Sequence, residues 1–381
     1  MKNLNIIGQI DIDKDFDKIF DLTKRFLITP VVGVNHYFEM SGESMYNCLL
    51  EEERLSKKNY YSKKKSIITA LLDRRKECGS FYTHAALHGD TDDTQLRSTS
   101  AVIRTLLLGL RDGLIEKEII EDVVEKHFKY YLTWNESIWF CHDTSEYHNL
   151  GPRTHFKVGY MDKDSRNTVT LNTHFDSMTT LGLVLGANIL KDSSHYIELY
   201  KKGLSAINKI LSYEKSIDFV DTFLQSIDTL FLKRAFKKRQ NIVDKFYSRI
   251  YHPVCFKIIK PTIFFKNGFI GRDLAVMNIH VDYLLVNIVD MLRFLKGYFR
   301  VSAEIDGFTF DEKELLYRIH SAVRLVQNEQ FIMEYIHSND LQKAWYVEML
   351  FLYEDYCNDY SDVFEKYKAK NTYVYKNYLF D

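Results

Sequence analysis

Proline is scarce in this chain, and that scarcity limits the fold more than any other feature of the sequence. Only four prolines occur in 381 residues, and the long runs between them carry apolar residues that recur three and four positions apart. Proline breaks a helix because it has no backbone N–H and its ring collides with the preceding turn, whereas apolar residues at this spacing line one face of a helix. The periodicity predicts helices over residues 14–27, 66–77, 94–111, 117–132, 178–190, 195–211, 218–233, 241–251, 283–299, 311–337 and 341–367. We therefore expect a mostly α-helical protein.

Strand-like alternation is confined to short segments. Residues 155–161 and 255–265 alternate apolar and polar side chains, and the second segment leads into Asn267-Gly268, a pair typical of hairpin turns. These patterns predict short β-ribbons added to a helical body. Because no linker rich in glycine, serine or proline interrupts the chain, we expect a single domain over 1–381, with residues 1–60 as an N-terminal helical extension that precedes or joins it.

Composition argues against several classes of function. The formal net charge is −1, so no strong field exists to attract a polyanion, and nucleic acid is not an expected partner. The five cysteines are scattered without metal-binding or redox spacing, which predicts reduced thiols and a cytoplasmic location. The acidic N-terminus and the lack of any apolar run of about 18 residues predict neither a signal peptide nor a transmembrane segment.

A weak internal repeat gives the helices an order. The pattern Asn-x-His-x-Asp occurs at residues 172–176 and 278–282, and an apolar helix-like run follows each copy. The segment HGDTDDT, residues 88–94, is also followed by such a run, with Asp92 in the place of the last aspartate of the other copies. One helical hairpin uses roughly 40 to 50 residues, so the three acids are about two hairpins apart. Stacked hairpins can close into a ring, and we expect an all-α fold, an α/α toroid of about six helical hairpins with short β-ribbon insertions.

The aspartates of HGDTDDT suggest a proton donor. Asp90, Asp92 and Asp93 crowd into four positions beside apolar sequence. Like charges a few ångströms apart disfavour joint ionisation, and burial adds to this effect, so one carboxyl group is expected to stay protonated near neutral pH. Two other interpretations of such acids remain open: a helix N-cap, which needs a single carboxylate, and a site for Mg²⁺.

These residues also resemble a known family. Gly79-Ser80-Phe81, followed by HGDTDDT and a helix rich in serine, alanine and leucine, is similar to the aspartate-rich segment of class II terpene cyclases and squalene–hopene-type cyclases. In that family the middle aspartate protonates an alkene or epoxide inside an α/α toroid lined by aromatic rings. The resemblance covers residues 79–110 and implies Asp92 as the acid, supported by Asp90 and Asp93. It further implies an isoprenoid as the small-molecule substrate and no required cofactor, with Mg²⁺ used only if the substrate is a diphosphate.

The chain also departs from the cyclase pattern. No repeated Gln-x5-Trp motif is present, only three tryptophans occur, and 381 residues are few for the usual pair of toroids.

Histidines support an alternative reading. His84, His88, His174 and His280 lie in or beside the acidic segments, and a histidine next to an aspartate can act as a general base. The same segments resemble those of glycan-active α/α toroid enzymes, namely uronate epimerases, lyases and unsaturated-glycuronyl hydrolases. The candidate catalytic residues in both readings are His88, Asp90, Asp92, Asp93, His174, Asp176, His280 and Asp282, and the candidate substrate-binding residues are Tyr82, His84, Trp139, Arg153 and Arg272.

Within the glycan reading, Arg153, Arg166 and Arg272 are candidates to bind a uronate carboxylate through two parallel hydrogen bonds. A further alternative is a metal site formed by His174 with Asp176 and His280 with Asp282. We assign no metal ligand among the candidate residues. The last alternative is a non-catalytic helical repeat protein that binds a partner and uses its acids only as caps.

Overall fold

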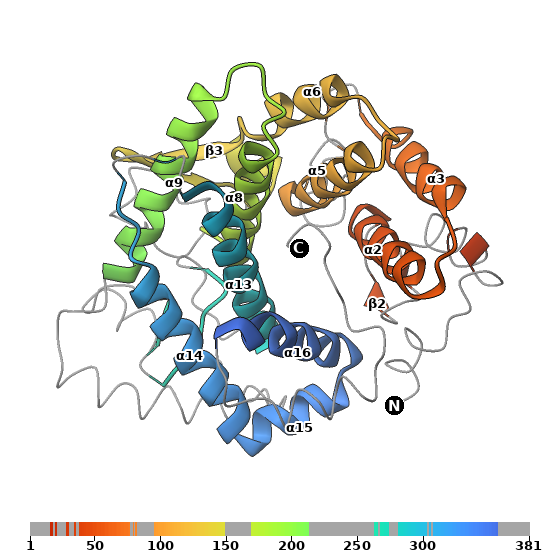
Figure 1. The fold of residues 1–381 in the computed structure, drawn as a ribbon. Helices are drawn as coiled ribbons and strands as arrows, with labels where there is room; N and C mark the ends of the chain where they lie inside the picture. Colours follow the sequence, from red (N-terminus) through yellow and green to blue (C-terminus); the bar gives the residue numbers. More distant parts are fainter. Residues whose placement is uncertain are drawn as a thin grey trace.

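The computed structural model describes residues 16–17, 20, 28–29, 34–35, 38–76, 79, 81, 95–148, 169–212, 263–265, 267–273, 281–302, 305 and 308–356. This part of the chain is mostly helical, which confirms the predicted fold class in its coarse form (Figure 1). The α-helices are α2 (Phe38–Ser56), α3 (Tyr61–Leu72), α5 (Leu96–Arg111), α6 (Lys117–His127), α7 (Thr144–Tyr147), α8 (Leu171–Gly186), α9 (Ser194–Ser212), α13 (Leu284–Val301), α14 (Glu312–Asn328), α15 (Gln330–Ser338) and α16 (Asp340–Tyr353). Two short 3₁₀ helices, η2 (Val281–Tyr283) and η4 (Glu354–Tyr356), adjoin α13 and α16, and the strands form two antiparallel pairs, β1 (Ile28–Thr29) with β2 (Val34–Asn35) and β3 (Tyr131–Trp134) with β4 (Ser137–Phe140).

The central helices form a row. Helices α2, α5, α8, α13 and α16 pack against one another in this order, and we call them the inner row. Helices α3, α6, α9, α14 and α15 lie around the periphery (Figure 1). Because α3 follows α2, α6 follows α5 and α9 follows α8, successive inner helices are separated in sequence by a peripheral helix.

Neighbouring helices of the inner row run parallel. Along α8 and α13, Gly182 lies close to the carbonyl oxygen of Gly297, and Gly186 lies close to Val301, so contacts advance in the same direction on both helices. The other pairs show the same order. Between α2 and α5, Glu43 contacts Arg104 and Tyr46 contacts Asp112; between α5 and α8, Arg97 contacts Asp176 and Arg104 contacts Thr180. Between the η2–α13 segment and α16, Asp282 contacts Gln342 and Arg293 contacts Glu348. The N-terminal ends of the inner helices therefore lie at one end of the molecule, and we call this end the rim.

Helix α8 occupies the middle of the inner row. All its residues from Leu171 to Leu185 are buried, as expected for a helix surrounded by protein on every side. Glycine allows the close contact with α13, since a Cβ atom on Gly182 would lie only 3.4 Å from the Gly297 carbonyl oxygen. The sequence predicted a helix over 178–190, but α8 begins at Leu171, so the first Asn-x-His-x-Asp segment lies inside the helix. Polar residues at the start of the helix find buried partners, which sequence periodicity does not reveal.

The hairpin β3–β4 was not predicted. The periodicity of residues 117–132 predicted one helix, whereas α6 ends at His127 and the chain then turns into the hairpin. The two strands pair from Tyr131 with Phe140 to Trp134 with Ser137, and they are rich in aromatic and β-branched residues, which favour strands. The predicted ribbon at 155–161 lies outside the described residues.

Two further boundaries bear on the sequence predictions. The turn at Asn267-Gly268 is confirmed: the Phe265 amide donates to the Phe269 carbonyl at 2.9 Å, and Gly268 has φ of +90°. The helix predicted over 311–337 is two helices, because Glu329 between α14 and α15 has an extended backbone. Within the described ranges, no helix combines the length and the apolar character needed to cross a bilayer.

The Gly268 turn gives the first testable prediction. A Cβ atom at Gly268 would lie 2.3 Å from the Ser321 carbonyl oxygen, so alanine requires a backbone shift in addition to an unfavourable positive φ. Gly113 also has a positive φ, +68°, but no atom lies within 4 Å of its added Cβ. We expect Gly113→Ala to reduce the free energy of unfolding by about 1 kcal/mol, and Gly268→Ala to cost roughly 1–3 kcal/mol more, measured by urea unfolding. Equal losses in the two variants would contradict this contact.

Candidate functional site

Charged side chains are buried between the helices of the inner row. Each inner helix contributes at least one of them. We call this group the inner polar cluster; its described members are Glu43 of α2, Arg97 and Arg104 of α5, Asp176 of α8, Asp290 and Arg293 of α13, and Glu348 of α16.

Arg104 joins three inner helices. Its Nε and Nη2 atoms donate to the two carboxylate oxygens of Glu43 at 2.8 and 2.9 Å, and Nη1 donates to Asp176 Oδ1 at 2.8 Å and Thr180 Oγ1 at 2.7 Å. The planar guanidinium suits such a two-pronged contact with a carboxylate. Burial opposes the charge of Arg104, but Asp176 and Glu43 outweigh this effect and raise its pKa above the ordinary value. Arg104 is therefore a permanent cation that links α2, α5 and α8.

Arg97 lies between two aspartates. Its Nη2 donates to Asp290 Oδ1 at 2.9 Å, and its Nε is 4.0 Å from Asp176 Oδ1. The guanidinium also lies over the ring of Trp345, 5.5 Å from the ring centre, an arrangement that favours a cation. Arg97 thus holds the carboxyl groups of α8 and α13 close to each other.

Arg293 extends the cluster to α16. Its Nε donates to Glu348 Oε1 at 2.7 Å, and its Nη1 is 3.6 Å from Asp290 Oδ1. Burial raises the pKa of Glu348 above its ordinary value, while Arg293 opposes that rise.

The described members of the cluster are four carboxyl groups and three guanidinium groups, and charges held away from water are costly unless they are paired. Burial raises the pKa of Asp290 to about 7; Arg97 opposes this rise and the charge of Asp176 adds to it. The Oδ2 atoms of Asp176 and Asp290 are both buried without a hydrogen-bond partner. A proton on Asp290 removes one buried negative charge and supplies a hydrogen-bond donor. The cluster therefore contains a carboxyl group that gains and loses its proton near neutral pH.

Sequence reasoning missed Asp290 as well as the arginines. The prediction placed a protonated carboxyl group at Asp92, whereas the described group with this property belongs to α13. A signal was present in the sequence: Asp290 and Arg293 are three residues apart, and Arg97 and Arg104 seven apart, within helices that are otherwise strongly apolar. Such spacing places each pair on one face of its helix.

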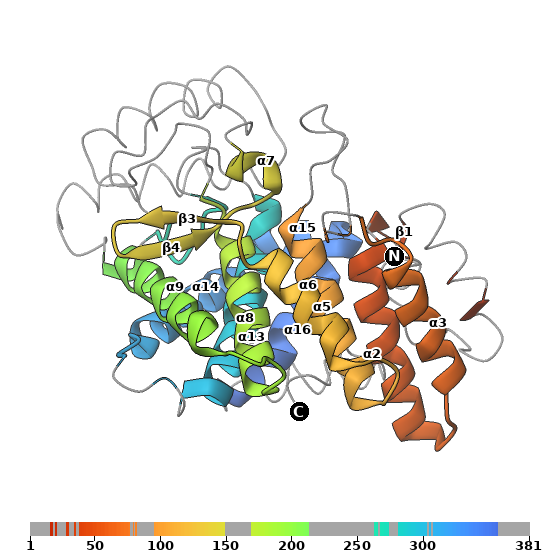
Figure 2. The same cartoon turned by 90° about the horizontal axis from the view of Figure 1, so that it is seen from above.

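The segments that lead into the inner helices are joined at the rim. Gln95, before α5, forms a β-bridge with Asp143, and Thr170, before α8, forms one with Asp273. The Asn287 side chain at the start of α13 donates to the Gly271 carbonyl at 2.9 Å. Figure 2 shows α7, with the hairpin β3–β4 nearby, at this end of the inner row.

His174 has no ring nitrogen left for a substrate. Its Nδ1 accepts from the Phe140 backbone amide at 3.1 Å, and its Nε2 is 3.4 Å from the Gly203 carbonyl oxygen. Burial lowers its pKa to about 3, so the ring is neutral. Trp139 stacks on it with ring centres 4.0 Å apart and is itself buried. Both residues therefore hold β4 against α8.

Asp176 and Asp282, the last residues of the two repeat copies, do not occupy equivalent positions. Asp176 lies in the second turn of α8 within the inner polar cluster, whereas Asp282 lies in η2, is exposed and bonds to the Tyr335 hydroxyl. Neither residue is a side-chain cap of the following helix, since the N-cap positions of α8 and α13 are Thr170 and Tyr283. The position of α13 that faces Asp176 is that of Asp290.

Arg272 lies at the rim. Its carbonyl oxygen accepts from the Leu171 amide at 2.9 Å, and its guanidinium lies over the Tyr283 ring, 4.9 Å from the ring centre. The remaining predicted site residues lie outside the described residues: Tyr82, His84, His88, Asp90, Asp92, Asp93, Arg153, Arg166 and His280. Among the residues that are described, no three His, Cys, Asp or Glu side chains are grouped to hold a metal ion.

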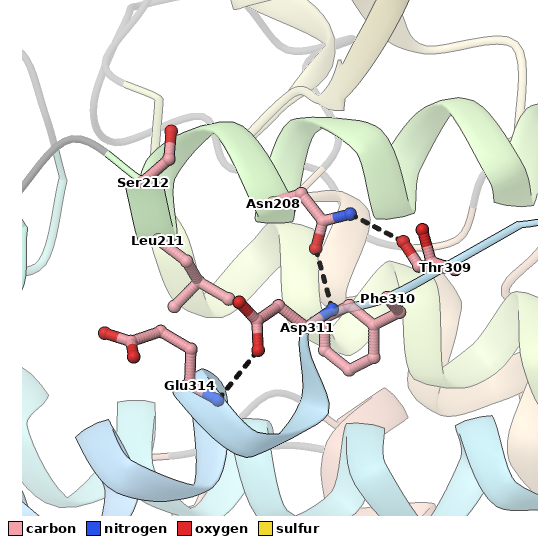
Figure 3. Close-up of a pocket in the computed structure, with 7 residues that line it drawn as sticks. All are labelled: Asn208, Leu211, Ser212, Thr309, Phe310, Asp311 and Glu314. Carbon is pink, nitrogen blue, oxygen red and sulfur yellow. Dashed lines mark hydrogen bonds between the residues drawn. The ribbon is translucent and has the colours of Figure 1, made fainter.

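A surface pocket of about 400 Å³ lies between α9 and the start of α14 (Figure 3). Asn208 spans it: its Nδ2 donates to the Thr309 carbonyl at 2.9 Å and its Oδ1 accepts from the Asp311 amide at 3.0 Å. Asp311 in turn caps α14 by accepting from the Glu314 amide. These contacts fix the entry to α14, and no member of the inner polar cluster lines the pocket.

Removing Arg104 tests the cluster. Arg104→Met leaves Glu43 and Asp176 buried without their main partner, and we expect a loss of about 3–5 kcal/mol in the free energy of unfolding. Arg111→Met on the same helix removes a half-exposed arginine 3.8 Å from Asp112, and we expect a loss of no more than about 1 kcal/mol. Urea unfolding of both variants checks this, and a similar small loss in both would refute the role of Arg104.

The raised pKa of Asp290 has a definite pH signature. Between pH 4 and 7, roughly, the folded state holds a proton that the unfolded state releases, so Asp290 makes the protein less stable as the pH rises, by at most about 1.4 kcal/mol per pH unit. Above about pH 7 the effect is constant. Asp290→Asn removes this pH dependence. The free energy of unfolding of the wild type is therefore expected to fall relative to that of the variant between about pH 4 and 7. Parallel pH profiles of the two proteins in urea unfolding would contradict the assignment.

Comparisons with known proteins supply no family for this arrangement. The chain matches no protein-family model, no curated protein and no solved structure.

Proposed function

We propose that the protein is an acid–base enzyme that acts on a glycan, with its active centre at the rim. The proposal includes an α/α toroid, of which the inner row and the peripheral helices form a part. Its support is the order of the described helices, in which parallel inner helices alternate in sequence with peripheral ones, as stacked hairpins require. Residues at the rim would then face a shared opening.

The observation that carries the proposal is the pair of carboxyl groups held by Arg97. Asp290 holds a proton near neutral pH while its neighbour Asp176 bonds to the cation Arg104. A buried carboxyl group with a raised pKa is the kind of group that enzymes use as a general acid. Asp176 and Asp290 are buried, so we infer that they set the charge around the site, and Asp92 stays the residue proposed to deliver the proton to the substrate. The segment 88–94 supports this, because it leads through Gln95 directly to Arg97.

Charge favours a glycan over an isoprenoid. The side chains that the inner helices direct toward one another include arginines and carboxyl groups, whereas an isoprenoid cation needs an apolar aromatic wall. Trp345 and Tyr283 are aromatic but stack on Arg97 and Arg272, an arrangement that suits a polar substrate with hydroxyl and acidic groups.

The second candidate function is a cyclase-like protonation of an isoprenoid. The segment from Gly79 to Thr94 favours it by its resemblance to the aspartate-rich segment of class II cyclases. A non-catalytic repeat protein has less support, because caps alone require exposed carboxylates with ordinary pKa values, and Asp290 is buried with a raised one.

A substrate panel tests the proposal. The full chain is incubated separately with saturated and unsaturated uronic-acid oligosaccharides, neutral oligosaccharides, geranylgeranyl diphosphate and squalene, and products are identified by mass spectrometry. We expect product only from a glycan, and we expect Asp92→Asn to lower the rate by roughly 10²–10⁴ because a positioned acid contributes that much. Asp73→Asn, at an exposed aspartate that ends α3, is the matched control and keeps full activity.

Each other outcome has a defined meaning. Product from an isoprenoid alone would replace the glycan proposal with the cyclase-like one. Product from none of the substrates would remove both, and full activity in Asp92→Asn would remove the proposed acid while leaving the substrate class in place.

A further inference from the structure

Arg104 and Arg293 of the inner helices differ from Arg272 in their hydrogen bonds to carboxylates. Arg104 donates hydrogen bonds to the carboxylates of Glu43 and Asp176, and Arg293 donates one to Glu348. Arg272 forms only a loose ion pair among the described residues: its Nε lies 3.6 Å from Asp273 Oδ2, beyond ordinary hydrogen-bond distance, and is buried without a hydrogen bond.

Arg272 is nevertheless held in one orientation. Its guanidinium lies over the Tyr283 ring at 4.9 Å, and stacking on the face of a ring leaves the edges of the guanidinium available for hydrogen bonds. Its backbone is fixed by the bond from the Leu171 amide and by the adjacent bridge between Thr170 and Asp273. The Arg272 side chain is 19% exposed to solvent, so a solute can reach it.

We propose that Arg272 binds an anionic substituent of the substrate, a carboxylate, sulfate or phosphate group, at the place where α8 and α13 begin. The planar fork of a guanidinium matches two oxygens of such a group. A partly desolvated position strengthens these hydrogen bonds relative to bulk water. Asp273 lies beside the guanidinium and weakens the long-range attraction for an anion, so the discrimination comes from directed hydrogen bonds.

The position fits the proposed function, on which this inference rests. The Arg272 guanidinium lies over the ring of Tyr283. Tyr283 precedes Asp290 by seven residues, which the rise of a helix makes about 10 Å. An anionic group at Arg272 would therefore place the neighbouring sugar units over the rim and above the inner polar cluster. The substrate class becomes an acidic glycan.

Binding measurements on the full chain test the inference. The probes for calorimetric titration are a galacturonate trisaccharide, its neutral methyl ester, and the sulfated and phosphorylated forms of the corresponding neutral trisaccharide. We expect the wild type to bind at least one anionic form about 10-fold or more tightly than the methyl ester, and the comparison among the anionic forms identifies which oxyanion is preferred. Arg272→Gln is expected to bind the anionic form and the ester equally.

Two further variants make the result specific. Arg300→Gln removes an exposed arginine near the opposite end of α13 and is expected to keep the full preference. Arg272→Lys keeps the charge without the planar fork and is expected to lose most of the preference for the anionic trisaccharide. The ratio of the two affinities is measured within each folded variant, so Arg272→Lys tests the inference even if Arg272→Gln does not fold.

The outcomes separate this inference from the proposed function. If the wild type binds the anionic and neutral trisaccharides equally, or if a folded Arg272→Gln keeps the preference, the role of Arg272 is refuted while the glycan proposal stands. If the wild type binds no trisaccharide, both fall.

Discussion

The structure depends on how charge is balanced away from water between the inner helices. Each arginine in the cluster contacts at least one carboxyl group from another helix, so the attraction offsets the cost of desolvation only when the helices are in register. A rotation of α5 that moved Arg104 from Glu43 and Asp176 would leave charges of both signs unpaired. Apolar packing tolerates many arrangements of similar volume. The cluster therefore disfavours arrangements of the inner row that would separate these charges, whatever its net contribution to stability.

The helices could be predicted from sequence to the extent that their burial is one-sided. Helix α9 was predicted over 195–211 and is found over 194–212, because its apolar stripe has the period of a helix. Helix α8 was predicted to begin too late, because it is buried on all sides and its first turns carry polar residues. The hairpin β3–β4 was hidden in a run with helical spacing, where aromatic residues satisfy either pattern.

The candidate site was predictable only in part for a related reason. The repeat located the beginnings of α5, α8 and α13, but it equated Asp176 with Asp282, which have different surroundings. A charged residue inside an apolar helix is informative only together with its partner, and the partners of Arg97 are on helices far away in sequence. Local pattern reports which residues share a face, while the pairing of faces is a property of the tertiary structure.

The parallel direction of the inner helices has an electrostatic consequence. The peptide dipoles of a helix sum to a partial positive charge at its N-terminus, and in the inner row these termini all lie at the rim. In an antiparallel bundle neighbouring dipoles cancel; here they reinforce one another. The unpaired backbone N–H groups in the first turns of these helices are therefore grouped at the rim. The near-zero formal charge of the chain therefore says nothing about how partial charge is distributed along the inner row, where the helix starts lie at one end and the helix ends at the other.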